Sequence, residues 1–571
     1  MAKLTGMRRG LTRYGDEEFA LYLRKAFIKA MGYSDDALSR PVIGIADTFS
    51  EYNACHANVP KITEAVKRGV MLAGGLPMTF PTISLHESFS FPTSMYLRNL
   101  MAMDTEEMMH ALPMDACVLI GGCDKTVPAQ LMAAASADIP TIQVVTGPML
   151  SGTHGEERVG ACTDCRRFWG QYRAGNIDSD EINRVEGRLV PTAGTCGVMG
   201  TASTMACMTE AMGMMLPGGA TIPTVYADRL RHAEAAGARA MEIATEGLCP
   251  SKILTPDSIA NGLRMLLAIG GSTNGVVHLA AIAGRLGIEV DMEAFDRMGE
   301  ETPVLVDLNP SGKYYMDDLH RAGGTAAILR ELKPLLNLEC MTVTGRTLGE
   351  EIEALPPGHA QDVVRPLSDP IHSGGGIAFL KGNLAGDGAI IKQSACSPDL
   401  LVHTGRAVVF DSLEDLAARI DDPDLDVTAE DILILRNAGP KGAPGMPEAG
   451  YIPIPRKLAA QGIKDMVRIS DCRMSGTAFG TIVLHAEPEA AIGGPLALVE
   501  SGDIVRLDVP KRLLQLEVTD EELDRRRAAW TPPITPPMRG YAKLFNEHIQ
   551  QAGSGVDFDF LVKQPYTDTT P

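Results

Sequence analysis

Two contrasting patterns of apolar segments divide this sequence. Over residues 41–150, short apolar runs alternate with amphipathic stretches at helical spacing, as where PVIGIADTFS is followed by ITEAVKRGVMLAGG. Such alternation is typical of βαβ units and a largely parallel sheet. After about residue 389, short apolar runs follow one another with little helical sequence between them. We therefore predict an α/β protein, with an N-terminal α/β/α domain and a C-terminal domain that is a small β-barrel or sandwich.

The limits of the two domains follow from length and from one Gly-rich stretch. A chain of 571 residues exceeds what one hydrophobic core usually supports. The segment SDPIHSGGGIAFLKGNLAGDG lies where the pattern changes and is the best candidate for a linker. We place the first domain at residues 1–370, the linker at 371–388 and the second domain at 389–571.

The charge and the apolar content exclude several classes of partner. A formal net charge of −20 disfavours nucleic acid and anionic membranes. No uncharged apolar run approaches the roughly 18 residues that indicate a membrane span, and the N-terminal residues lack the apolar core of a secretory signal. We expect a cytoplasmic protein. In that reducing compartment, its 11 cysteines are better explained as thiols and metal ligands than as disulfides.

Cys55, Cys123 and Cys196 are the candidate soft metal ligands. Each lies in a Gly- or Asn-rich turn after or between apolar segments, whereas a single cysteine is most often a core residue. Iron–sulfur clusters usually take four thiolates, so three would leave an iron open to substrate and suited to Lewis-acid chemistry. Cys162 and Cys165 form a lone CxxC motif, which fits a zinc, redox, structural or incidental loop pair.

Glu87, Asp124 and Glu448 are the candidate hard ligands. Asp124 directly follows Cys123 in LIGGCDKTVPAQ, after an apolar run, and Glu448 lies in a long turn-rich loop. Carboxylate oxygens favour Mg²⁺. Lys125 would ordinarily be a salt-bridging surface residue. Beside a cation its amine could be neutral and take part in catalysis, including as a carbamate that adds two oxygen ligands.

Ser475 and Thr477 lie in the Gly-flanked turn RMSGTAFG, after a short apolar run. This turn fits a nucleophile or an oxyanion site, and an ordinary polar turn is the alternative. The sequence contains no GxSxG, Walker A or GxGxxG motif, so specific signals for a hydrolase, a P-loop protein or a Rossmann enzyme are missing.

Five segments in order, NACH, GGCDKTVPA, TAGTCGVMGTAST, GMPE and SDCRMSGTAFG, resemble the dihydroxy-acid and sugar-acid dehydratase family, which includes 6-phosphogluconate dehydratase. The resemblance implies a C-terminal β-barrel domain, an active site between the domains, and a homodimer or homotetramer. It implies a [2Fe–2S] or [4Fe–4S] cluster on Cys55, Cys123 and Cys196. It further implies Mg²⁺ surrounded by Glu87, Asp124, carbamylated Lys125 and Glu448, with Ser475 as the catalytic base and Thr477 beside it.

The stretch SLHESFSFPTSMYLRNLMAMDTEEM resembles the pentonate dehydratases within that family. The implied reaction removes water from a 2,3-dihydroxy carboxylate such as L-arabinonate or D-xylonate and gives the 2-keto-3-deoxy acid, with several acids plausible as substrates. One alternative is the branched-chain dihydroxy-acid dehydratase, which acts on 2,3-dihydroxyisovalerate. A different class of alternative is an iron–sulfur redox or sensor protein, in which the carboxylates and the Ser-Gly-Thr turn would have no role.

Overall fold

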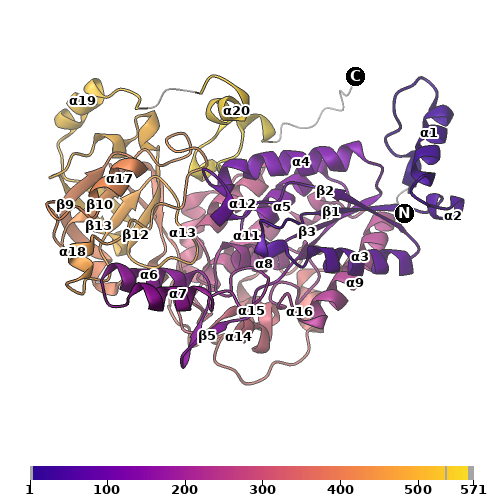
Figure 1. Cartoon of the computed structure of the whole chain (residues 1–571), viewed down its shortest axis with the longest axis horizontal. Coiled ribbons are helices and arrows are strands. Elements are labelled where there is room, and N and C mark those ends of the chain that lie inside the picture. The colour runs from indigo at the N-terminus through magenta and orange to yellow at the C-terminus, as the bar shows by residue number, and fades with distance from the viewer. Residues whose placement is uncertain (1–3, 534–536, 563–571) are drawn as a thin grey trace.

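A parallel sheet and a β-barrel occupy opposite ends of the molecule (Figure 1). The structure is a computed structural model that describes residues 4–533 and 537–562, so the outermost residues of both predicted domains lie outside the described residues. The predicted α/β class, with a parallel N-terminal sheet and a C-terminal barrel, is confirmed. Among the described residues, no helix has both the length and the apolarity required to cross a membrane.

The N-terminal sheet is the support for the first part of the site. Within the described residues its four strands are all parallel, in the order β2-β1-β3-β4 (Leu76–Pro81, Val42–Asp47, Ala116–Gly121 and Thr141–Val145). Figure 1 shows α4 (Arg98–Ala111) on one side of this sheet and α3 (Val59–Leu72) with α9 (Ala227–Glu246) on the other. Buried on both faces, β3 is apolar throughout, as parallel strands usually are.

Helix α3 illustrates how the sequence pattern produces this layer. Its residues Val59, Ile62, Val66 and Val70 recur at helical spacing and are fully buried. The helix packs closely on α9, because a Cβ at Gly69 of α3 or at Gly237 of α9 would collide with the backbone of the other helix. The paired glycines therefore set the distance between the two helices.

The second part of the fold is a barrel that closes on itself. In the described chain its eight strands follow the order β10-β11-β12-β8-β7-β14-β13-β9. Closure leaves no strand edge to pair with another chain. The first two strands, β7 and β8, lie wholly or partly within the segment proposed as a linker, and the domain boundary itself stays a prediction. The strands are β7 Ala378–Gly382, β8 Ala385–Ile391, β9 Val402–Phe410, β10 Ile432–Leu435, β11 Arg468–Ser470, β12 Ile482–Glu487, β13 Ile504–Asp508 and β14 Leu513–Leu516.

Further helices fill the space around and between the sheet and the barrel. The longer ones are α1 Glu17–Lys29, α5 Thr126–Ala137, α6 Thr163–Arg173, α7 Ser179–Glu186, α8 Thr201–Ala211, α11 Pro256–Ala268, α12 Asn274–Gly284, α13 Met292–Glu301, α15 Gly324–Leu332, α19 Asp520–Ala529 and α20 Gly540–His548. The shorter ones are α2 Asp35–Leu38, α10 Pro250–Ile253, α14 Met316–Arg321, α16 Leu348–Ala354, α17 Leu413–Arg419 and α18 Arg456–Ala459. A small hairpin, β5 Gly152–His154 with β6 Glu157–Val159, precedes α6.

Two buried arginines fasten the C-terminal segment to the N-terminal helices. Arg98 of α4 donates hydrogen bonds of 2.8 and 2.7 Å to the carbonyl oxygens of Gly555 and Val556. Arg285, just after α12, pairs with Asp557 at 2.6 Å. Both guanidinium groups are shielded from solvent, so the C-terminal carbonyl and carboxylate oxygens satisfy charges that water cannot reach.

Replacing Asp557 with alanine should lower the free energy of unfolding by about 3–5 kcal/mol, because the buried Arg285 charge loses its principal partner. Asp559→Ala is the matched control, since Asp559 pairs with His548 at an exposed position and should contribute less than about 1 kcal/mol. The midpoint of urea unfolding measures both variants. Equal midpoints would show that the Arg285 contact does not hold the segment.

Candidate active site

Two groups of metal-ligating side chains lie next to each other in the part of the chain that the structure describes. In the first, the ligand atoms of Cys55, His86 and Cys123 are all within 4.8 Å of one another. In the second, carboxylate oxygens of Glu87, Asp124 and Glu448 meet the same limit. The groups are adjacent because consecutive residues, His86 with Glu87 and Cys123 with Asp124, each supply one ligand to each group.

The carboxyl edge of the parallel sheet brings the first two thiols together. Cys55 lies in a short helical turn after β1, and Cys123 lies between β3 and α5. Buried His56 joins the two segments, since its Nε2 accepts hydrogen bonds of 3.0 and 3.1 Å from the amides of Gly122 and Cys123. Burial lowers the pKa of His56 to about 4, so the ring is neutral and can accept these bonds. At Gly122, any Cβ would collide with the Thr146 hydroxyl.

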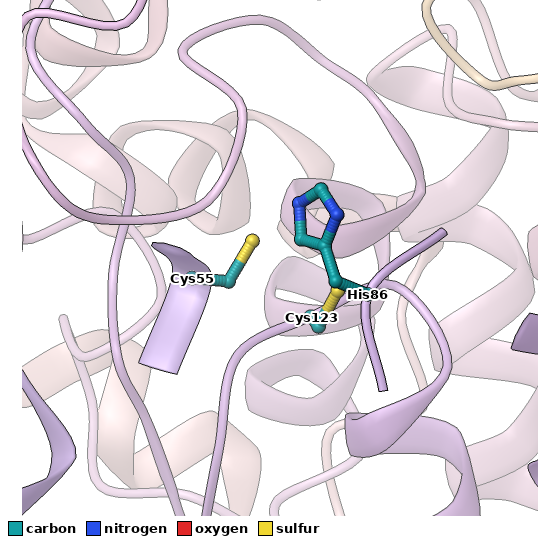
Figure 2. Close-up of side chains that lie close together, drawn as sticks. All are labelled: Cys55, His86 and Cys123. Atoms are coloured by element: carbon teal, nitrogen blue, oxygen red, sulfur yellow. The ribbon is translucent and has the colours of Figure 1, made fainter. Parts of the chain in front are cut away.

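His86 is the member of the first group that the sequence analysis missed. Figure 2 shows its ring beside Cys55 and Cys123, with the three side chains arising from separate segments. Its Nδ1 accepts a hydrogen bond of 3.2 Å from the Ser88 amide. A neutral His86 in this tautomer carries its proton on Nε2, which makes that nitrogen a hydrogen-bond donor. An imidazole held in this way suits contact with a polar substrate better than metal ligation.

The third predicted thiol, Cys196, lies in the same neighbourhood. A hydrogen bond with Cys162, burial and the nearby Asp124 and Cys123 raise its pKa well above the ordinary value. In turn, the pKa of Cys55 is raised by its hydrogen bond with Cys123, by burial and by the proximity of Cys123 and Cys196. The three cysteines singled out from sequence are therefore close enough to influence one another's pKa, although Cys196 is outside the group whose ligand atoms lie within 4.8 Å.

Two buried cations compensate the three carboxylates. The Lys125 ammonium lies 2.5 Å from Asp124, 3.6 Å from Glu448 and 3.9 Å from Glu87. Arg473, which the sequence analysis did not select, pairs with Glu448 at 2.5 Å and with Glu87 at 3.5 Å. Both cationic side chains have 0% exposure. Glu448 follows β10 and Arg473 follows β11, so the barrel contributes directly to this group.

The pKa values of Glu87 and Glu448 shift in opposite directions, although both carboxylates face the same two cations. Burial would raise the pKa of Glu87, but Arg473, Lys125 and the hydroxyls of Ser94 and Thr93 lower it to about 2. Burial dominates at Glu448, and its pKa is raised in spite of Arg473 and Lys125. The side chain of Glu448 is 13% exposed and that of Glu87 is 27% exposed, which accounts for the contrast. A bound cation would favour the ionised form of both.

Ser475 and Thr477 share a turn that the barrel presents to the N-terminal part. Their hydroxyl oxygens are 2.8 Å apart, and the Thr477 carbonyl accepts a hydrogen bond of 3.0 Å from the Thr163 hydroxyl. Between them, a Cβ at Gly476 would lie 2.6 Å from the side chain of Ser272, so glycine permits the close approach. Asn274, two residues beyond Ser272, donates a hydrogen bond of 3.2 Å to Glu448. The turn thus packs on the segment that also supports the carboxylate group.

The missed residues carried only weak sequence signals. His86 and Arg473 directly precede or closely precede selected residues, Glu87 and Ser475, but neither stands in a ligand-spacing motif. An arginine is most often a surface residue, and its burial here depends on carboxylates that are distant in sequence. Their position next to Glu87 and near Ser475 was the one sequence feature that pointed to His86 and Arg473.

Comparison with known families agrees with this geometry. Residues 40–351 match the N-terminal model of the dihydroxy-acid/6-phosphogluconate dehydratases, and residues 362–556 match the C-terminal model. The chain belongs to the dihydroxy-acid/6-phosphogluconate dehydratase family. It is accordingly an enzyme of the hydro-lyase class, which removes water by breaking a carbon–oxygen bond.

Three curated relatives are similar over nearly their whole length. An L-arabinonate dehydratase of Rhizobium leguminosarum bv. trifolii is 46% identical over 96% of this chain and 95% of its own. A 6-deoxy-6-sulfo-D-gluconate dehydratase of Pseudomonas putida is 45% identical over 92% and 91%. A dihydroxy-acid dehydratase of Agathobacter rectalis is 40% identical over 93% and 95%. The relatives named for sugar acids are thus more similar than the one named for the dihydroxy acid.

If Glu87, Asp124 and Glu448 bind Mg²⁺, the stability of the protein should depend on this ion. Arg473→Met should lower stability by about 3–5 kcal/mol in EDTA, because Glu87 and Glu448 lose a buried counter-charge. Excess Mg²⁺ should raise the unfolding temperature of this variant more than that of the wild type, since cation binding relieves the repulsion between carboxylates. Differential scanning fluorimetry in EDTA and in Mg²⁺ measures both effects.

Arg456→Met is the control for that experiment, because Arg456 is 64% exposed and pairs with Asp421 outside the group. Its Mg²⁺-dependent shift should equal that of the wild type. An equally small shift in Arg473→Met would rule out a cation site at these carboxylates.

Proposed function

We propose that this enzyme is a sugar-acid dehydratase that converts a 2,3-dihydroxy carboxylate, such as L-arabinonate or D-xylonate, to the 2-keto-3-deoxy acid. The observation that carries the proposal is the adjacency of a thiol group and a carboxylate group through His86–Glu87 and Cys123–Asp124. A small substrate can then contact both groups at once. The substrates named for the sugar-acid relatives support this substrate class.

The donor chemistry of the two groups fits two different cofactors. Thiols at Cys55, Cys123 and Cys196 suit an iron–sulfur cluster, [2Fe–2S] with [4Fe–4S] as the alternative. Oxygens of Glu87, Asp124 and Glu448 suit Mg²⁺. When bound, the cluster and Mg²⁺ supply Lewis acidity at the leaving hydroxyl and at the substrate carboxylate.

Lys125 would complete the oxygen ligands as a carbamate. Its ammonium lies among three carboxylates and neutralises part of the negative charge that would otherwise attract a divalent cation. Carbamylation replaces this positive charge with a negative one and adds two oxygen atoms. The buried position of the side chain, within 4 Å of all three carboxylates, is the support for this modification.

Ser475 is the proposed base that removes the C2 proton. Its oxygen lies 2.8 Å from the Thr477 hydroxyl, which can donate a hydrogen bond to the deprotonated serine. A free serine is too weak a base, so a nearby cation must lower its pKa. The electrons of the C2–H bond form the C2–C3 double bond as the C3–O bond breaks, so the C2 proton and the C3 hydroxyl leave as water overall. The resulting enol tautomerises to the 2-oxo acid.

Arg473 and His86 have supporting roles in this scheme. Arg473 fixes Glu448 and Glu87 in one arrangement through its two terminal nitrogens. His86 lies beside Cys55 and Cys123, and its Nε2 can donate a hydrogen bond to a substrate hydroxyl because Nδ1 accepts one from the Ser88 amide. Both residues hold or orient groups and neither needs to change its charge during the reaction.

The serine assignment predicts that Ser475→Ala lowers kcat by about 10²-fold or more, because a general base contributes roughly 10²–10⁴-fold. The visible absorption of the anaerobically purified cluster should stay at the wild-type level. Ser501→Ala is the control, since Ser501 is an exposed barrel residue that accepts a hydrogen bond from the Val409 amide. A Ser475→Ala enzyme with wild-type turnover would remove serine from the base role.

The ligand assignment predicts a difference between Cys196→Ser and His86→Asn. Serine at 196 should abolish most of the iron bound after anaerobic purification, whereas asparagine at 86 should leave it unchanged, because His86 Nε2 is assigned as a donor. Iron and sulfide analysis measures this, with Cys249→Ser as the control for loss of a half-buried cysteine elsewhere. If iron were lost in His86→Asn and kept in Cys196→Ser, His86 would be the cluster ligand and Cys196 would not.

Turnover of a panel of acids tests which substrate the enzyme prefers. L-arabinonate and D-xylonate should be turned over with higher kcat/KM than 2,3-dihydroxyisovalerate, the substrate expected for the branched-chain alternative. Formation of the 2-keto-3-deoxy acid is the readout. The redox-protein alternative leaves the carboxylate group and the Ser475–Thr477 turn without a role. A homodimer or homotetramer in the cytoplasm remains our prediction for its assembly and location.

A further inference from the structure

Cys162 is a fourth thiol at the edge of the proposed cluster site. Its sulfur lies 3.6 Å from that of Cys196, within hydrogen-bonding distance for two thiols. Cys162 precedes α6, and Cys165 lies in the first turn of that helix, where its thiol also hydrogen-bonds to Cys162. The three half-buried cysteines therefore form a continuous chain of sulfur atoms, in the order Cys165, Cys162, Cys196.

The surrounding contacts hold this chain in place. The Thr163 hydroxyl, next to Cys162, is bonded to the Thr477 carbonyl at 3.0 Å. Asp164 accepts hydrogen bonds of 2.8 Å from the Gly160 amide and 2.9 Å from the Tyr315 hydroxyl. The start of α6 is thus anchored to the barrel turn and to two neighbouring segments, so Cys162 stays beside Cys196.

Neither metal binding nor the proposed reaction accounts for Cys162 and Cys165. A fourth thiolate on the cluster would occupy the iron position that the substrate needs. Among the described residues, Cys162, Cys165 and Cys196 do not form a group with all ligand atoms within 4.8 Å, so the three are not arranged as a separate metal site. What the arrangement does provide is a thiol in position to react with Cys196.

We propose that Cys162 and Cys165 form a disulfide relay that protects Cys196 when the cluster is lost to a peroxide. This inference rests on the proposed role of Cys196 as a cluster ligand. Cys162 first forms a disulfide with Cys196. Cys165 then displaces Cys196, which leaves a Cys162–Cys165 disulfide and a free Cys196 thiol ready to bind a new cluster.

The chemistry balances with hydrogen peroxide as the oxidant. Loss of the cluster releases Cys196 in the thiolate form in which it would bind iron, and this thiolate attacks the O–O bond and becomes a sulfenic acid, with hydroxide as the leaving group. The Cys162 thiol attacks the sulfenic sulfur, forms the S–S bond and releases water. Two sulfur atoms have then given up one electron each to the peroxide. The Cys165 thiolate next attacks the Cys162 sulfur and expels the Cys196 thiolate, with no net oxidation.

The geometry suits the first disulfide. A disulfide bond is about 2.05 Å long, so the two sulfurs at 3.6 Å must approach by roughly 1.5 Å. Without the relay, a sulfenic acid at Cys196 proceeds to the sulfinic and sulfonic acids, of which the sulfonic is irreversible. The relay therefore keeps a proposed ligand in a recoverable oxidation state.

The experiment exposes anaerobically purified holoenzyme to hydrogen peroxide and maps its cysteines by mass spectrometry without reduction. The wild type should contain the Cys162–Cys165 disulfide and a free Cys196 thiol. Cys165→Ser should accumulate the Cys162–Cys196 disulfide, because the second exchange is blocked. Cys162→Ser should instead carry sulfinic or sulfonic acid at Cys196. Cys249→Ser is the control and should match the wild type.

A second readout is recovery of the cluster. After reduction and addition of ferrous iron and sulfide, the wild type should regain its visible absorption several-fold more completely than Cys162→Ser. The proposal is overturned if Cys165→Ser shows no Cys162–Cys196 disulfide, or if Cys162→Ser lacks iron before oxidation, which would make Cys162 a ligand. A wild type purified without iron would refute the proposed function, while disulfide mapping of that same protein would still report on the relay.

Discussion

The site depends on the placement of two buried cations among three carboxylates. Lys125 and Arg473 reach the group from the N-terminal part and from the barrel, and neither is exposed to solvent. Without them, the close approach of Glu87, Asp124 and Glu448 would be repulsive in a region of low dielectric constant. The ion pairs also fix the barrel relative to the sheet, because Arg473 links Glu448 of one part to Glu87 of the other.

The thiols come together for a different reason, the topology of a parallel sheet. Strands β1 and β3 are neighbours, so the turns after them meet at one edge and bring Cys55 close to Cys123. His56 then connects the turns through two backbone amides. Because Asp124 follows Cys123 and Glu87 follows His86, this backbone arrangement also positions the carboxylates. The proposed soft and hard ligands are therefore placed by the same few backbone segments.

Local pattern was enough to predict the sheet, the strand-rich second half and the residues that stand in turns after apolar runs. Cys123 and Asp124 were found this way, because a thiol and a carboxylate side by side suit a metal better than a core. Arg473 and His86 could not be found from pattern. Arg473 joins Glu448 to Glu87, which is 386 residues away, and the proposed role of His86 depends on the tautomer of its ring. The glycines around β7 resemble a linker in the sequence, whereas in the structure the strand pairs with β8 in the barrel, and the boundary between the domains stays a prediction.

The attachment of the C-terminal segment bears on how the enzyme matures during synthesis. Arg98 and Arg285 belong to the first half of the chain, yet their partners Gly555, Val556 and Asp557 are among its last residues. Until residues 555–557 have been synthesised, these guanidinium groups lack those partners, although Arg98 can still bond to Asn99 and Arg285 can pair with Glu106. Helices α4 and α12 therefore gain these contacts only when residues 555–557 pack against them, so the N-terminal helices and the C-terminal segment depend on each other for their final packing.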